Sequence, residues 1–215
     1  MYGQPDGGPT HDAPQNGYLN RSRVSLDYIP RDNNHPYRPA IIFRMAEAYL
    51  SYAEALNESS ERMSHKQEIL DNLNKIRHRA GIAEYGTGTD ENGFTRIKIN
   101  FSDQKEVRRL IHKERRVEFV GEGVRYHDLR RWKTAHYGIG NLNEQGENPD
   151  WGVNGPDYGM NYYGTEYTDQ GDNAFFKRTK YMDRVYPRKF YWYPIHQSEI
   201  DKDPTLVQGP FWLGE

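Results

Sequence analysis

Acidic and basic side chains alternate densely between residues 114 and 131. Glu114 and Glu118 stand four positions apart, which places both on one face of a helix, and a pair of carboxylates is what glycoside hydrolysis requires. Arg115 is three positions from Glu118, and Arg125 is three from Asp128, so most of these acids have a basic neighbour within one turn. The pattern therefore favours an ion network between two helices over a catalytic pair. Its predicted members are Glu114, Arg115, Arg116, Glu118, Arg125, Asp128 and Arg131.

Aromatic and amide side chains gather in the segment from 151 to 167. Sugar rings pack their apolar C–H faces on aromatic planes, and their hydroxyls need donors and acceptors beside those planes. The segment supplies both kinds of group, so it is a candidate ligand site. Anchoring of the rings to the helices, or contact with a partner chain, is the alternative that the sequence leaves open. The candidate residues are Trp151, Tyr158, Tyr162, Tyr163, Asn154 and Asp157.

Metal, nucleotide and nucleic-acid chemistry have little support in the sequence. Asp169 and Asp172 flank Gly171 and offer hard oxygens to Ca²⁺, but the EF-hand order is absent and a solvated turn is the better interpretation. The G-x-G of residues 121–123 lacks a third glycine and follows a helix, which excludes a dinucleotide fingerprint. The histidines have no ligand spacing, and the arginine-rich runs contain interspersed acids. We expect no catalytic residues, no cofactor and no nucleic-acid partner.

Composition agrees with a folded globular protein. The chain has 215 residues, of which 35% are hydrophobic and 17 are tyrosine, enough for a packed core with amphipathic rings at the surface. The absence of cysteine excludes disulfides and thiolate metal sites. No apolar run reaches the ~18 residues of a membrane span. The opening residues lack the pattern of a signal peptide and resemble a loop interior, which indicates that Met1 is not the native start.

Apolar periodicity predicts a helical hairpin. One stripe runs from Ala40 to about Asn57, and a second helix begins at a Ser64 cap and ends at Gly81. A short polar link makes the two antiparallel, as in tetratricopeptide-like repeats. The stripe residues are Ile42, Ala46, Tyr49, Ala53 and Leu56 in the first helix, and Ile69, Leu73, Ile76 and Ala80 in the second.

The rest of the chain predicts two more helices and long loops. A third helix starts at the Ser102–Asp103 cap and runs to Gly121, and a fourth follows Gly123 through residues 124–135. Residues 82–100 read as a loop with at most a short strand, and 137–178 as a long segment without regular structure. The end, from Arg188, predicts an extended strand, a turn, one short helical turn and a tail that packs aromatics.

Four ordered blocks match one known family. FRMAEAYLSYAEALNE, LNKIRHRAGI, ERRVEFVGEGVRYHDLRRWK and YPIHQSEIDKDPTLVQGP resemble signatures of the carboxy-terminal half of the SusD/RagB family, nutrient-binding lipoproteins of the outer membrane. The match covers about residues 38–137 and 187–212. The resemblance implies a mainly α, tetratricopeptide-like helical-hairpin fold with long loops and little β structure over residues 1–215.

The same resemblance implies a function. It predicts a binding protein, not an enzyme, that captures oligosaccharides on the extracellular face of the outer membrane and delivers them to a SusC-like TonB-dependent transporter. The family's lipid anchor and most of its helix pairs belong to an amino-terminal half that these residues do not match. Peptide uptake is one alternative. An accessory glycan-degrading enzyme and a structural lid are others.

Overall fold

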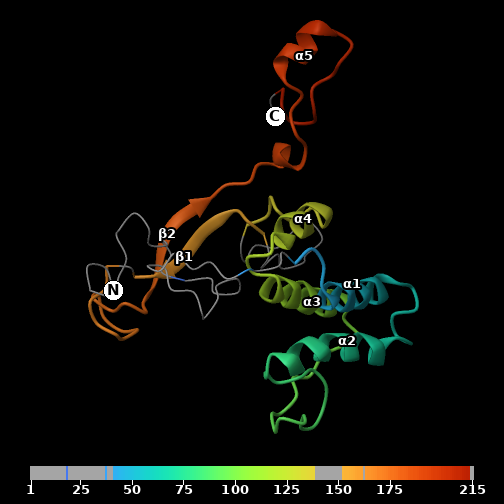
Figure 1. Cartoon of the computed structure of the whole chain (residues 1–215), viewed down its shortest axis with the longest axis vertical. Coiled ribbons are helices and arrows are strands. Elements are labelled where there is room, and N and C mark those ends of the chain that lie inside the picture. Colours follow the sequence, from blue (N-terminus) through green and yellow to red (C-terminus); the bar gives the residue numbers. More distant parts are fainter. Residues whose placement is uncertain (1–17, 19–36, 38–40, 139–151, 162, 214–215) are drawn as a thin grey trace. The chain divides into compact units, whose positions relative to one another are not determined.

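The structure, a computed structural model, describes residues 18, 37, 41–138, 152–161 and 163–213. Two compact units divide the chain, one formed by Ser25–Asp128 and the other by Met1–Val24 together with Leu129–Glu215. Helices dominate the described residues, and the strands form a single two-stranded sheet there (Figure 1). The prediction of a mainly α fold is therefore confirmed. No helix in the described ranges is long and apolar enough to cross a membrane.

The core of the first unit is built by three helices: α1 (Met45–Glu58), α2 (Lys66–Arg79) and α3 (Gln104–Glu118). Their inward faces carry fully buried aliphatic side chains, among them Leu50, Ile69 and Ile111. Burial of such side chains removes apolar area from water and holds the helices together. The predicted stripes of the first two helices are confirmed except at two positions. Ile42 precedes α1 and is 97% exposed, and Ala80 follows the end of α2 and is also exposed.

Helix α2 begins differently from the prediction. Its N-cap position is His65, and the Ser64 hydroxyl donates backwards to the Glu61 carbonyl, 2.8 Å away, so Ser64 is not the cap. A serine hydroxyl can hydrogen-bond either a carbonyl of the preceding turn or an N–H group of a following helix. Here it bonds the carbonyl of the preceding turn. Gly81 follows the helix with φ of +65°, the left-handed conformation that suits glycine.

Helix α3 has the predicted cap, since the Asp103 carboxylate accepts from the backbone N–H groups of Lys105 and Glu106. Gly121 and Gly123, both with positive φ, separate α3 from α4 (Val124–Arg131). Helix α4 stops at Arg131, earlier than the sequence suggests, and Lys133 just beyond it has a positive φ of 57°. Residues with positive φ end a right-handed helix.

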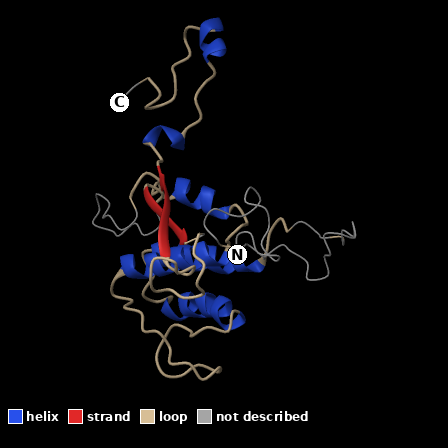
Figure 2. Ribbon diagram, turned by 90° about the vertical axis from the view of Figure 1, so that its left-hand side faces the viewer, coloured by secondary structure: helices blue, strands red, loops and turns tan. Residues whose placement is uncertain are grey.

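The second unit contains the sheet, which the sequence did not predict. Strands β1 (Gly155–Met160) and β2 (Arg178–Arg184) pair antiparallel with an irregularity between Asp157 and Tyr158, and Figure 2 shows the two side by side. The expectation of no regular structure over 137–178 is therefore wrong for β1. A small second core packs Leu129 and Ala135 against partly buried rings.

The carboxy-terminal segment folds as short turns. A 3-10 helix, Arg188–Tyr191, stands where an extended strand was predicted, and α5 (Gln197–Lys202) is the expected helical turn. The tail packs aromatics as predicted, because the Trp212 and Phe190 ring centroids lie 6.0 Å apart.

Candidate functional site

A cavity of about 950 Å³ opens in the first unit between α2 and the loop of residues 84–101. Four half-buried apolar side chains line it and also pack against the main hydrophobic core: Tyr49, Leu70, Ile99 and Phe101. Charged and amide side chains from α2 and from the loop complete the lining. A concave surface with apolar side chains and surrounding polar groups is the usual form of a small-molecule site.

The loop is fixed to α2 by one amide side chain. Asn74 of α2 donates to the Tyr85 carbonyl at 2.9 Å and accepts from the Tyr85 N–H at 2.8 Å. The side chain thus pairs with the backbone as a neighbouring strand would. Bridges between Tyr85 and Ile97 and between Thr89 and Thr95 then close the loop on itself, which gives the cavity a firm second wall.

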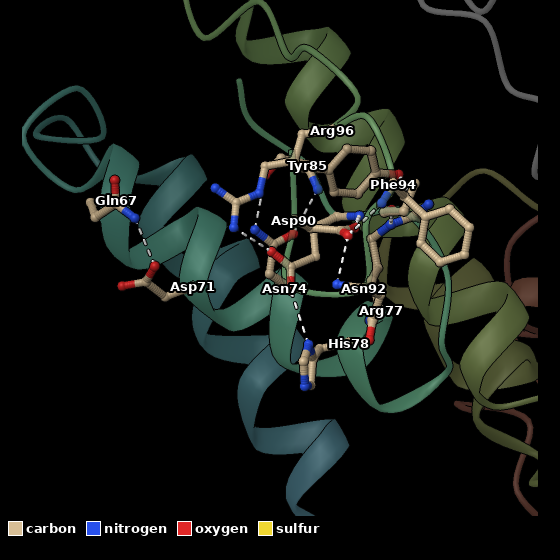
Figure 3. A network of polar contacts seen from close by, with 12 residues as sticks. Gln67, Asp71, Asn74, Arg77, His78, Tyr85, Asp90, Asn92, Phe94 and Arg96 are labelled. Atoms are coloured by element: carbon tan, nitrogen blue, oxygen red, sulfur yellow. Dashed lines mark hydrogen bonds and ion pairs between the residues drawn. The ribbon is translucent and has the colours of Figure 1, made fainter. Parts of the chain in front are cut away.

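Asp90 organises the tip of this loop. Its carboxylate accepts from the backbone N–H groups of Glu84, Asn92 and Phe94 at 3.1, 3.0 and 2.8 Å (Figure 3). Desolvation acts to raise the pKa of Asp90, but these backbone hydrogen bonds outweigh it, and the pKa is lowered from 3.8. The ionised carboxylate is therefore part of the folded loop.

Glu84 connects an arginine and a histidine of the cavity wall. Its carboxylate accepts from Arg96 at 2.9 Å and lies 3.2 Å from His78 Nδ1 on α2. The contact with His78 ties the loop to the helix. The contact with Arg96 neutralises much of the charge of Glu84 and Arg96.

Behind the cavity, Arg77, Tyr85 and Glu114 form a buried cluster. The Glu114 carboxylate accepts from Arg77 at 2.5 Å and from the Tyr85 hydroxyl at 2.8 Å. Burial and then the charge of Glu114 raise the pKa of Tyr85, so the phenol stays protonated and acts as a donor. Glu114 is thus committed to holding α2, the loop and α3 together.

The other predicted network residues lie at several places. Arg115 makes a two-bond pair with Asp128 of α4, at 2.9 and 3.0 Å, and both side chains are at most 5% exposed. Glu118 accepts from Arg79 at 2.5 Å and also from Arg44.

The three remaining members are arginines. Arg116 is exposed on α3, Arg125 is half-buried on α4, and Arg131 lies over the Trp132 ring at 4.8 Å. The predicted members therefore contribute to several clusters, in which Arg77, Arg79 and Arg44 also take part.

The predicted sugar-site residues fall on and beside β1. Asn154 donates to the His136 carbonyl at 2.5 Å and also bonds the Tyr186 backbone, which braces the unit. Asp157 accepts from the Tyr181 hydroxyl at 2.7 Å and pairs with Arg184 at 3.0 Å.

The two described tyrosines of this set are exposed. Tyr158 is covered on one face by the Arg178 guanidinium at 4.1 Å, and Tyr163 is 82% exposed. Trp151 and Tyr162 lie outside the described residues. The structure therefore brings Asp157 and Tyr158 together on β1 and leaves Tyr163 open to solvent.

The calcium candidates lie on the loop between the strands. Asp172 pairs with Lys177 at 2.8 Å, and both Asp169 and Asp172 are exposed. In the part of the chain that the structure describes, no group of three or more acidic, histidine or cysteine side chains is arranged to hold a metal.

The cavity beside α2 was missed by reasoning from the sequence. Its walls come from a helix and a loop whose contact depends on Asn74 and Asp90, and single amide and acid side chains carry no periodic signal. The combination D-E-N-G at residues 90–93 does indicate a tight turn. Hydrogen bonds from following backbone N–H groups to an aspartate side chain, as at Asp90, are typical of such turns.

Comparison with known proteins gives relatives that are all described as SusD-like. The chain is 32% identical over 109 residues to SusD-like protein P25 of Formosa agariphila. The match covers 51% of this chain and 18% of that protein. SusD-like protein P38 of the same organism is 32% identical over 103 residues, 48% of this chain and 19% of that protein. The chain thus spans about a fifth of the length of these curated relatives.

A solved structure agrees with these relatives. The crystal structure of a SusD-like protein from Bacteroides fragilis matches 80% of this chain and 26% of its own chain, with a TM-score of 0.51 at 26% identity. The model of the SusD family matches residues 3–212. Motif, relatives and fold agree, and the chain belongs to the SusD family.

Proposed function

We propose that this chain is part of a cell-surface nutrient-binding protein that captures oligosaccharides. The observation that carries the proposal is the family match over residues 3–212, together with the likeness to a SusD-like crystal structure over 80% of the chain. Captured ligand passes to a partner SusC-like TonB-dependent transporter at the extracellular face of the outer membrane. A lipid anchor elsewhere in the whole protein provides the membrane attachment.

Exposed aromatic rings support a saccharide ligand. Tyr158, Tyr163 and Tyr167 present rings at the surface on and beside the β1–β2 sheet. Aromatic planes that remain in contact with water are suited to the apolar faces of sugar rings.

The state of the carboxylates supports binding without hydrolysis. Hydrolysis by a carboxylate pair needs one protonated acid and one free carboxylate on either side of the scissile bond. Glu114 is buried against Arg77 and Tyr85, and Glu118 is held by Arg79 and Arg44. Both acids are occupied by internal cations, so neither is available to a substrate.

The test is an array of oligosaccharides and peptides probed with the 215-residue chain, followed by chromatography of each bound ligand after incubation. We expect selective binding of oligosaccharides, recovered uncleaved. Binding confined to peptides would replace saccharide capture by peptide uptake. Cleaved products would show an accessory enzyme instead.

A second experiment tests whether the ligand contacts Tyr163. Tyr163→Ala removes a ring that is 82% exposed, so the fold should remain intact. If this ring stacks on the ligand, affinity for the selected oligosaccharide should fall by about 1–3 kcal/mol, as for a lost aromatic hot spot. The control is Tyr37→Ala, which removes another exposed tyrosine of the chain. Equal affinity of both variants and the parent chain would reassign Tyr163 to another role.

A further inference from the structure

We propose that the cavity between α2 and residues 84–101 binds an acidic sugar, meaning a saccharide ring that carries a carboxylate or a sulfate. The inference rests on the proposed capture of oligosaccharides and adds both a site and a substrate class to it. Its basis is the combination of apolar groups and unneutralised cations in one cavity of about 950 Å³.

The apolar part of the lining suits one face of a sugar ring. Leu70 comes from α2, and Ile99 and Phe101 come from the end of the loop, and all three remain partly accessible while packing against the core. Partly accessible apolar surface of this kind gains from contact with the C–H face of a pyranose, because that contact removes water from both surfaces. Packing against the core also holds these groups in place before a ligand arrives, which lowers the entropy cost of binding.

The cations of the lining differ in whether an acid neutralises them. Arg79 is bonded to Glu118 at 2.5 Å and Arg96 to Glu84 at 2.9 Å. For Lys75 and Lys98, by contrast, the described part of the chain provides no acidic side chain within ion-pair distance, although the ammonium of Lys75 lies 4.4 Å from the Tyr49 ring centroid. One of these lysines comes from the helix and the other from the loop, so an anion in the cavity has a cation on either wall.

The acidic side chains that line the cavity do not outweigh its basic ones. Glu84 is engaged by Arg96 and His78, and Asp71 accepts from the Gln67 amide at 2.7 Å. Glu91 is the third lining carboxylate, set against the two lysines. The lining as a whole holds four Lys and Arg residues against three Asp and Glu, whereas the chain has a net charge of −2. The cavity is therefore locally more basic than the protein, which favours an anion there.

The experiment uses titration calorimetry on the 215-residue chain with four probes. These are a galacturonate tetrasaccharide, a sulfated galactose tetrasaccharide, a neutral galactose tetrasaccharide and a glutamate-rich peptide. The principal variant is Lys98→Gln, which keeps a polar side chain in place of the charged one. Lys75→Gln is the second variant, and Lys113→Gln, an exposed lysine of α3 outside the cavity, is the matched control for charge.

We expect at least one acidic tetrasaccharide to bind more tightly than the neutral one and to weaken as ionic strength rises. Lys98→Gln should reduce that affinity roughly tenfold, the scale of a lost hydrogen bond to a charged group. Lys113→Gln should leave it unchanged, and all variants should keep the parent unfolding temperature. The two acidic probes separate carboxylate from sulfate as the recognised group.

Three results would overturn the inference in different ways. Neutral binding as tight as acidic binding, or equal affinity of Lys98→Gln and Lys113→Gln, removes the acidic-sugar site but leaves oligosaccharide capture standing. Absence of binding to every tetrasaccharide also removes the acidic-sugar site, and it rejects oligosaccharide capture only when the array of oligosaccharides shows no binding either. Binding of the peptide alone, with dependence on Lys98, assigns the cavity to acidic peptides and rejects the acidic-sugar site.

Discussion

At the residue scale, the buried pair of Arg115 and Asp128 is the contact whose loss should cost most. Both side chains are at most 5% exposed, and Arg115 also donates to the Ser51 hydroxyl at 3.0 Å. We predict that Arg115→Ala lowers the free energy of unfolding by about 3–5 kcal/mol, because Asp128 is left buried and without its two-bond partner. Urea denaturation followed by circular dichroism measures the change.

Two further variants test the reason for that loss. Arg108→Ala removes an arginine of the same helix from its exposed pair with Glu58, and should cost only about 0–1 kcal/mol. The double variant Arg115→Met, Asp128→Leu should recover most of the lost stability, since neither member of the pair is left buried without the other. If Arg115→Ala and Arg108→Ala had equal effects, burial would not be the cause.

Asp90 provides a residue-scale prediction on pH. Its pKa is lowered from 3.8 in the folded chain, because its backbone hydrogen bonds favour the ionised form more than desolvation disfavours it. A lowered folded pKa contributes stability that is complete above the unfolded value and is lost as pH falls through the folded value. The loop of residues 84–96 should therefore loosen only in acid below pH 3.8.

Nuclear magnetic resonance can follow this titration directly. The amide signals of Asn92 and Phe94, which donate to Asp90, should shift with a midpoint below 3.8. The midpoint should disappear in Asp90→Asn, whose side chain does not titrate. A midpoint at or above 3.8 would mean that the hydrogen bonds do not favour the carboxylate.

Sequence spacing identified the charged residues of this region but not most of their partners. Helical spacing reports only neighbours within one turn, whereas Glu114 bonds Arg77, 37 positions earlier. Asp128 was paired in the prediction with neighbours on its own helix, and the structure adds Arg115 from α3. Such pairings depend on how helices pack, which a single sequence does not encode in any local pattern.

At the element scale, the cap of α3 is the clearest case in which local sequence determines structure. Asp103 accepts from Lys105 N–H at 2.9 Å and from Glu106 N–H at 3.2 Å, which satisfies two of the free donors at the helix start. We predict that Asp103→Ala lowers the free energy of unfolding by about 1 kcal/mol. Thermal unfolding is the measurement.

Ser102 is the matched control for this prediction. It was part of the predicted cap, but its backbone N–H donates to the Asn100 side chain and its carbonyl accepts from Arg62. Ser102→Ala should therefore leave stability close to that of the parent chain. A larger loss for Ser102→Ala than for Asp103→Ala would transfer the capping role to the serine.

The elements themselves were predictable to unequal degrees. Helices α1 and α2 have apolar stripes that report directly on a buried face, and most of their core residues, such as Ala53 and Leu73, were predicted correctly. Strand β1 has the sequence GPDYGM, in which two glycines and a proline weaken any strand signal. Its partner β2 begins 18 positions after β1 ends, so pairing across the sheet, and not local propensity, forms both strands.

At the scale of the whole molecule, the two units have cores of very different size. In the first unit, buried aliphatic and aromatic residues from α1, α2 and α3 form one cluster, and the fully buried ones include Leu50, Leu73 and Ile111. In the second unit the described core centres on Leu129 and Ala135 and is completed by half-buried rings. Stability follows buried apolar area, so the two units should not be equally stable.

Hydrogen exchange measured by mass spectrometry tests this inequality. We predict that backbone amides of α1, α2 and α3 exchange slowest, and that amides of β1 and β2 exchange earlier, because the sheet has only two strands and a small core beside it. The internal standard is Arg115→Ala, which should accelerate exchange in α3 and leave β1 and β2 unchanged if the units open independently. Should the strands instead accelerate together with α3, the two units would unfold as one cooperative body, and the stability of the sheet would derive from the helical core.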